Sequence, residues 1–260
     1  MAGEQRSMRV EAVVLRHADW GEADRLVTLY TREEGKLQAI AKGARKIRSR
    51  KAGHLEPFTR VALLLARGRD LWIITQAETV EPHLSIRENL DLIVYASVVV
   101  ESLDRFTYEE GQNLQLYQLL IDTLARLERM DDPFIVVSYY QVRLLDHLGF
   151  RPNLFTCVQC EAEIQPQNQY FSPIGGGVLC PRCGSNAAGA IPVTLDALKY
   201  LRHYQRSGYK DARRAQIPLS TRREMENLLR TYFTFLLERA LNSPDFLSRL
   251  RGPNRNAASA

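Results

Sequence analysis

The sequence lacks any uninterrupted apolar run of the roughly 18–20 residues that a membrane-spanning helix needs. It also lacks a basic segment followed by an apolar stretch near residue 1, so no signal peptide is predicted. Only four cysteines occur among the 260 residues. In a reducing compartment four cysteines are not expected to form disulfides. These absences predict a cytoplasmic protein with no membrane partner.

The motifs of several enzyme classes are also missing. No G-x-x-x-x-G-K-[ST] segment is present, which argues against ATP hydrolysis by a P-loop. The five histidines are scattered along the chain. Asp19, Glu22 and Asp24 could indicate a metal-dependent nuclease, but a turn between two strands explains them better. We therefore predict that the protein is not an enzyme. The nuclease alternative is open to test with labelled DNA and Mg²⁺ or Mn²⁺.

The charge that is present is unevenly distributed. Residues 1–83 hold 15 Lys or Arg against 11 Asp or Glu, a net +4. Residues 84–150 hold 5 against 11, a net −6, and residues 151–260 hold 15 against 8, a net +7. Two basic ends thus flank an acidic middle. An anionic ligand such as nucleic acid is expected to contact the ends.

The first third of the chain has the apolar alternation of short strands. The expected strands are Met8–His17, Arg25–Thr31, Lys36–Lys42, Thr59–Ala66 and Leu71–Val80. A longer excursion separates the third strand from the fourth. Five strands in this arrangement predict a small closed barrel of the OB-fold type over residues 1–83.

After Pro82 the apolar period becomes helical. Two S/T-x-x-E patterns, at residues 85–88 and 221–224, predict capping boxes, and Asp131–Asp132–Pro133 predicts a helix start. Gly149 is a natural helix terminator. We expect an α+β multidomain protein. Its predicted parts after the barrel are a helical bundle at 84–150, a four-cysteine unit at 151–192, further helices at 193–250 that complete the helical domain, and a disordered tail at 251–260.

The four cysteines carry the most specific spacing in the chain. Cys157 and Cys160 form one C-x2-C pair, and Cys180 and Cys183 form another nineteen residues later. Two such turns can complete a tetrahedral shell of four thiolates, which predicts a structural Zn²⁺ with no open position for catalysis. The alternative, a redox dithiol pair, usually shows one C-x2-C in a βαβ context, and that context is absent.

A basic run joins the third and fourth expected strands. Its six cations are Lys42, Arg45, Lys46, Arg48, Arg50 and Lys51. An isolated charge run is usually a solvated loop. Because this run interrupts a barrel and contains small residues, we favour contact with phosphates, in which cations displace bound counterions.

Two further groups are candidates for nucleic-acid contact. Trp20 lies in a polar turn where it could stack on a base, whereas Tyr30 and Phe58 are expected in the core. Lys199, Arg202 and Arg206 share one helical face at i, i+3 and i+7. An ordinary solvated face explains those three cations as well as DNA does.

Several short segments follow one another in a specific order. Residues 21–25 read G-E-x-D-R, residues 35–45 read G-K-L-x-A-I-A-K-G-A-R, and residues 55–58 read L-E-P-F. Residues 171–176 read F-S-P-x-G-G, and the four cysteines lie around them. In the order and spacing of these segments the chain resembles the RecO family of bacterial recombination mediators, over about residues 8–250.

The resemblance implies an N-terminal OB-fold, a helical domain, a zinc unit and a DNA-repair function in the RecF pathway, at the nucleoid. It also implies binding of single- and double-stranded DNA, annealing of complementary strands, and the partners RecR, the single-stranded DNA-binding protein and, indirectly, RecA. Two alternatives stay open beside it: an RNA-binding OB module with a zinc ribbon, and a scaffold that binds only proteins.

Overall fold

The structure is a computed structural model that describes residues 7–108, 111–129 and 131–237. These residues fall into two compact units. The first contains residues 7–96 and 103–129, and the second contains residues 97–102 and 131–237. The predicted tail at 251–260, and residues 238–250 of the predicted C-terminal helices, lie outside the described residues. The predicted domain boundaries stay predictions.

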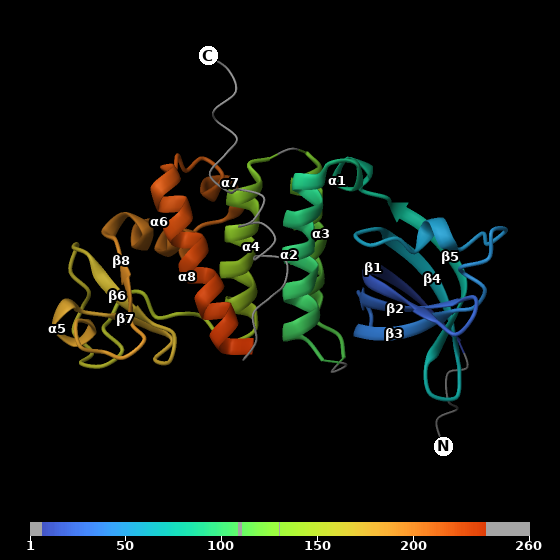
Figure 1. Cartoon of the computed structure of the whole chain (residues 1–260), viewed down its shortest axis with the longest axis horizontal. Helices are drawn as coiled ribbons and strands as arrows, with labels where there is room; N and C mark the ends of the chain where they lie inside the picture. Colours follow the sequence, from blue (N-terminus) through green and yellow to red (C-terminus); the bar gives the residue numbers. More distant parts are fainter. Residues whose placement is uncertain (1–6, 109–110, 130, 238–260) are drawn as a thin grey trace, which may run out of the picture. The chain divides into compact units, whose positions relative to one another are not determined.

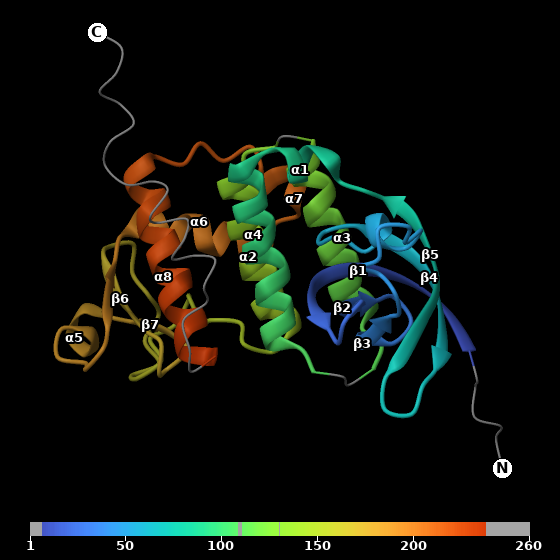
Figure 2. The ribbon, with the colours of Figure 1, turned by 45° about the vertical axis from the view of Figure 1, so that its right-hand side comes forward.

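The first unit begins with a five-stranded closed barrel (Figure 1). Its strands are β1 (Ser7–Trp20), β2 (Asp24–Thr31), β3 (Gly35–Ala41), β4 (Arg60–Arg67) and β5 (Trp72–Glu81). Neighbouring strands are antiparallel except β3 and β5, whose short parallel pairing closes the barrel in the order β1-β2-β3-β5-β4. The turned view in Figure 2 shows the strands curling around one another. The five-stranded barrel expected from the sequence is therefore confirmed.

The barrel interior follows the alternation of the strands. On β3, Leu37, Ala39 and Ala41 are buried while the residues between them are only half-buried. Tyr30 and Phe58 are buried as expected. The interior cluster is small and aliphatic, and its other members are Val10, Ala12, Val14, Val27, Leu29, Ala44, Leu55, Val61, Leu63, Leu65 and Ile74.

A β-bulge in β1 changes which side chains face outward. Val14 pairs with Leu29 and Arg16 pairs with Thr28, so Leu15 is the extra residue. Before the bulge, the even-numbered residues of β1 point into the barrel. Because one extra residue reverses the alternation, Arg16 faces outward, where it can meet a partner outside the barrel.

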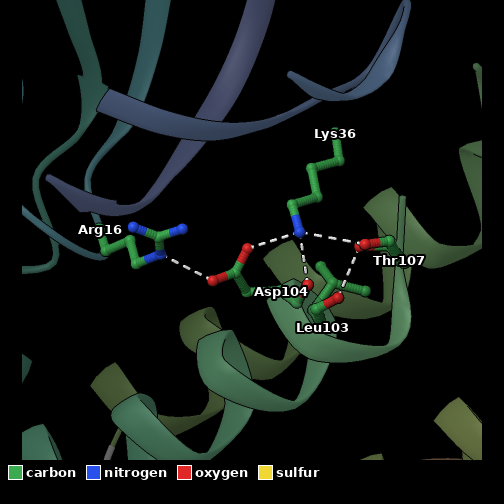
Figure 3. Close-up of polar contacts among 5 residues, drawn as sticks. All are labelled: Arg16, Lys36, Leu103, Asp104 and Thr107. Atoms are coloured by element: carbon green, nitrogen blue, oxygen red, sulfur yellow. Dashed lines mark hydrogen bonds and ion pairs between the residues drawn. The ribbon is translucent and has the colours of Figure 1, made fainter. Parts of the chain in front are cut away.

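That partner is Asp104, a residue of the same unit near the end of helix α2 (Leu90–Phe106) (Figure 3). The Asp104 carboxylate lies 2.7 Å from Arg16 Nε and 2.7 Å from Lys36 Nζ. Lys36 Nζ also donates to the carbonyl oxygens of Asp104 and Thr107, at 2.5 and 3.0 Å. A cation at a helix C-terminus satisfies carbonyls that have no partner within the helix. Two barrel strands are thereby tied to the end of α2.

We expect Asp104→Ala to destabilise the first unit by about 3 kcal/mol, because the substitution leaves Lys36 without its counterion. Both side chains are only 14% exposed, so solvent replaces little of the lost attraction. Urea unfolding measures the change. Asp122→Ala removes an exposed acid that faces Arg126 at 3.6 Å and should cost less than about 1 kcal/mol. Equal losses in the two variants would contradict the assignment.

The same interaction should depend on pH. Burial alone would raise the pKa of Asp104, but hydrogen bonds from Lys36 and Arg16 outweigh burial and lower it. A carboxyl whose pKa is lower in the folded state stabilises fully above its unfolded pKa of about 3.9. That stabilisation is lost as the pH falls through the folded pKa. The stability difference between the wild type and Asp104→Ala should therefore shrink in strongly acidic solution.

Helices follow the barrel, as expected, but the first capping prediction is wrong. Helix α1 (Leu84–Glu88) begins before Ser85, after a left-handed His83, and has no side-chain cap. It is only five residues long. The Asn89 side chain then caps α2 by accepting from the backbone N–H groups of Asp91 and Leu92. Helix α3 (Leu114–Glu128) begins after Asn113, whose side chain caps it by accepting from the Leu116 N–H.

The second unit combines helices with a small sheet. Helix α4 (Pro133–His147) packs against α6 (Leu195–Arg206), α7 (Tyr209–Ala212) and α8 (Leu219–Leu237). The sheet has the order β7-β6-β8, from β6 (Gln169–Ser172), β7 (Gly177–Leu179) and β8 (Ile191–Val193), and α5 (Pro181–Gly184) follows β7. None of the helices in the described part of the chain is long and apolar enough to cross a membrane.

Of the helix ends predicted for this unit, some are confirmed and one is wrong. Asp132 caps α4 ahead of Pro133, and Gly149 adopts a left-handed φ of 79°, both as expected. The predicted capping box at Thr221 is wrong, because α8 begins at Leu219. Glu224 instead accepts from the backbone N–H and the hydroxyl of Thr194, the N-cap of α6, at 2.5 and 2.7 Å.

Candidate metal centre and candidate nucleic-acid interface

The four cysteines come together in the second unit. Cys157 and Cys160 lie in the loop that precedes β6, Cys180 directly precedes α5, and Cys183 lies within α5. All four are free thiols, and their sulfur atoms lie within 4.8 Å of one another. The Sγ atoms of Cys160 and Cys180 are 3.8 Å apart. The two C-x2-C pairs of cysteines therefore lie together in the folded chain, as their spacing predicts.

Local backbone contacts shape each of the two turns. The Cys157 N–H donates to Ala162 O at 2.8 Å, and the Cys183 N–H donates to Cys180 O at 3.0 Å. Gly184 follows Cys183 where a Cβ atom would come within 2.5 Å of Tyr170. A side chain at this position would displace the Tyr170 ring from the turn, so glycine permits the close approach of α5 to β6.

The electrostatics of the cluster favour a cation at its centre. Burial alone would raise the pKa of Cys157, but backbone N–H groups of Cys180, Cys160 and Gln159 lower it to about 6. A hydrogen bond with Cys180, together with burial, raises the pKa of Cys183 to about 12. Adjacent thiols cannot all ionise unless positive charge lies between them. The four sulfurs can therefore hold a metal ion as thiolates.

The sulfur geometry fits a tetrahedral ion. With metal–sulfur bonds of about 2.3 Å, a tetrahedral Zn²⁺ site has sulfur–sulfur edges of about 3.8 Å. The distance between the Cys160 and Cys180 sulfurs matches that edge. The other pairs of sulfurs lie within 4.8 Å of each other, so they need to move only slightly closer to surround an ion. Four cysteines complete such a shell, so the cluster offers no open position for a reacting group.

The predicted basic loop lies between β3 and β4 in the first unit. Lys42, Lys46, Arg48 and Arg50 are exposed, and within the described residues their side chains make no hydrogen bond or ion pair. A cation with no protein partner can neutralise a phosphate without breaking an internal contact. These four side chains form the part of the predicted set that is available to an anion.

The other two cations of the run anchor the loop. Arg45 lies 3.2 Å from the Asp19 carboxylate and donates to the carbonyl oxygens of Gly21 and Glu22. Lys51 Nζ donates to Ile74 O of β5 at 3.0 Å. Arg45 and Lys51 are thus occupied by the barrel itself. Their assignment to DNA contact stays a prediction, and the structure provides a second role for each.

Trp20 lies beside this loop. It is the last residue of β1, rather than a residue of the following turn, and is 46% exposed. It pairs with Asp24, whose carboxylate accepts from the Gly43 N–H at 2.7 Å. The turn that follows Trp20 is therefore held against the start of the basic loop. An exposed indole beside free cations is a suitable stacking surface for a base.

The carboxylates that raised the nuclease alternative have other roles. Asp19 forms an ion pair with Arg45, and the Asp24 carboxylate accepts a hydrogen bond from the Gly43 N–H. Among the described residues, Asp19, Glu22 and Asp24 do not converge as metal ligands. The turn explanation accounts for them.

The three cations predicted on one face of α6 have different partners. Lys199 is exposed and lies 3.4 Å from Asp196. Arg202 instead donates to Leu154 O, and its guanidinium carbon lies 5.1 Å from the centre of the Phe155 ring. Arg206 stacks on the same ring at 3.9 Å. Two of the three cations therefore gather on Phe155, and the third has a carboxylate neighbour.

Two clusters on the first unit have no counterpart in the sequence patterns. Glu11 on β1 binds Arg60 and accepts from the Tyr117 hydroxyl of α3 at 2.7 Å. His83 is buried, and its Nδ1 lies 2.5 Å from the Glu128 carboxylate, with Glu81 nearby. Only the barrel–helix packing reveals these groups, because no local spacing connects their residues. Both lie beside cavities of about 420–440 Å³.

Comparison with known proteins gives matches along nearly the whole chain. Residues 5–83 match the family description "Recombination protein O N terminal", and residues 87–245 match "Recombination protein O C terminal". A DNA repair protein RecO from Roseiflexus sp. is 39% identical over 98% of this chain and 90% of its own length.

Two more relatives carry the same name. DNA repair protein RecO of Symbiobacterium thermophilum is 35% identical over 93% of this chain and 97% of its own length. The protein of that name from Dehalococcoides mccartyi is 34% identical over 93% and 96%. The two family matches and these relatives of nearly full length thus agree with one another. The chain belongs to the RecO family of DNA repair and recombination proteins.

Proposed function

We propose that this chain is a recombination mediator without enzymatic activity. It binds single- and double-stranded DNA, anneals complementary strands, and helps RecR load RecA onto DNA that is coated by the single-stranded DNA-binding protein. Its place of action is the nucleoid in the cytoplasm. Membership of the RecO family supports the repair function. The partners and the annealing step rest on the family resemblance.

One observation carries the DNA-binding part of the proposal. Lys42, Lys46, Arg48 and Arg50 project from one loop of the barrel without a carboxylate partner in the described part of the chain. Annealing requires two phosphate chains to approach each other despite their repulsion. Cations that bind both chains lower that repulsion, and the release of condensed counterions drives the binding. Such a step needs no covalent chemistry.

We also propose that Cys157, Cys160, Cys180 and Cys183 hold a structural Zn²⁺. The ion supplies the cross-link between the loop before β6 and helix α5, which a sheet of strands of three and four residues cannot provide alone. On α6, the side chains of Lys199, Arg202 and Arg206 form a second, weaker proposed contact for DNA.

Annealing of two complementary labelled strands, followed by fluorescence transfer, tests the proposal. Four phosphate contacts on duplex DNA give a salt slope of about −3.6, so an approximately fourfold rise in salt should weaken binding about 100-fold. Annealing should slow correspondingly. Annealing that is absent at low salt, or unchanged at higher salt, would overturn the electrostatic mechanism.

The RNA-binding alternative is separated from the proposal by competition. Single-stranded DNA and RNA of equal length and sequence are offered to the protein with one labelled probe. We expect DNA to compete at least as well as RNA. If RNA displaces DNA while DNA does not displace RNA, the chain is an RNA-binding OB module instead.

A further inference from the structure

Ile47 is the most exposed large apolar residue in the described part of the chain. Its side chain is 105% exposed, against 42–73% for the other large apolar side chains that face solvent. The Ser49 N–H donates to Lys46 O at 2.9 Å, which closes a turn with Ile47 and Arg48 at its two central positions. The apolar side chain therefore occupies the tip of the basic loop.

The loop cannot easily fold back to bury this side chain. Arg45 and the Gly43 N–H fix its beginning to the β1–β2 turn through Asp19 and Asp24. Lys51 fixes its end to β5, and Ala44 and Leu55 are buried in the barrel core on either side. A turn held at both ends presents its tip in a defined position. The exposure of Ile47 is thus imposed by the anchors.

The neighbours of Ile47 identify the kind of partner that would cover it. Lys46 and Arg48 flank it directly, and neither side chain has a partner within the described residues. A protein partner with an apolar pocket would have to bury or neutralise two cations beside that pocket. DNA offers both features at once, because stacked apolar base faces lie beside a row of phosphates.

We propose that Ile47 inserts between two neighbouring bases of the DNA strand whose phosphates Lys46 and Arg48 bind. The inference rests on the DNA-binding function proposed above and assigns a further contact residue to it. Aliphatic wedges of this kind unstack a base step, and the cost is offset by contacts that the opened strand permits.

The full-length protein carrying Ile47→Ala tests the proposal with duplex DNA that contains 2-aminopurine, a base whose fluorescence rises when it is unstacked. The wild type should raise the fluorescence on binding. Ile47→Ala should remove most of that rise and weaken duplex binding about tenfold, because a buried apolar contact is lost. Its salt slope should equal that of the wild type, since no phosphate contact is removed.

Ile174→Ala is the matched control. Ile174 is 73% exposed in the tight turn between β6 and β7 and has no cation next to it in sequence. It should behave like the wild type in every measurement. If Ile47→Ala keeps the full fluorescence rise, Ile47 is not a wedge, whatever becomes of DNA binding. If the wild type binds no DNA at any salt, the proposed function fails first and the wedge fails with it.

Discussion

Replacing Cys157 with serine should release the metal ion and unfold the small sheet around it. The wild type is expected to hold one Zn²⁺ per chain, and the variant close to none. Structural zinc contributes on the order of 10 kcal/mol of apparent folding free energy. Cys157 is only 1% exposed, so the substituted side chain cannot turn out to solvent. Metal analysis and limited proteolysis measure the effect, with new cleavage expected between residues 151 and 193.

Gln159→Ala is the matched control for that variant. Gln159 lies between Cys157 and Cys160 but is exposed and supplies no thiol. It should retain zinc and resist cleavage. Treatment of the wild type with a strong chelator should reproduce the Cys157→Ser cleavage pattern. A chelated wild type that remains resistant would show that the sheet folds without metal, and the structural role of zinc would be wrong.

The parts of the fold that the sequence predicted depend on local chemistry. Alternation along a strand needs only neighbouring residues, so the five barrel strands were predicted within a few residues. Asp132 caps α4 because it lies directly ahead of the helix. The wrong cap at Glu224 has a tertiary cause. Its carboxylate satisfies the N-cap of α6, thirty residues away in sequence, rather than its own helix.

In the candidate sites too, the sequence predicts the features that depend on local spacing and misses those that depend on distant partners. The cysteine cluster follows from spacing, because each C-x2-C turn forms locally and one cross-link completes it. The sequence predicts six equivalent cations in the basic run, but two of them bind other parts of the barrel. Arg45 depends on the β1–β2 turn and Lys51 on β5. No local pattern records these partners, so only the folded barrel separates anchoring cations from free ones.

The distinction between free and anchoring cations has a direct consequence for mutagenesis. The double variant Lys46→Glu/Arg48→Glu should lose about 100-fold or more in affinity for single- and double-stranded DNA. It removes two phosphate contacts and places two repelling charges at the tip of the loop. The slope of log affinity against log salt should fall by about two on duplex DNA. Stability should change by no more than about 0.5 kcal/mol, because both side chains are exposed and make no hydrogen bond or ion pair within the described residues.

Lys199→Glu reverses a single charge on the weaker proposed surface, α6, and provides the comparison. Lys199 is 60% exposed but already lies near Asp196, so reversing its charge should change DNA affinity no more than a fewfold. Titrations with a labelled strand at several salt concentrations distinguish the two variants. A scaffold that binds only proteins predicts no DNA binding by any form. If the loop variant binds as the wild type does while Lys199→Glu does not, the phosphate-binding surface lies on α6. The barrel loop then loses its role, since phosphate affinity must follow the cations that make the contact.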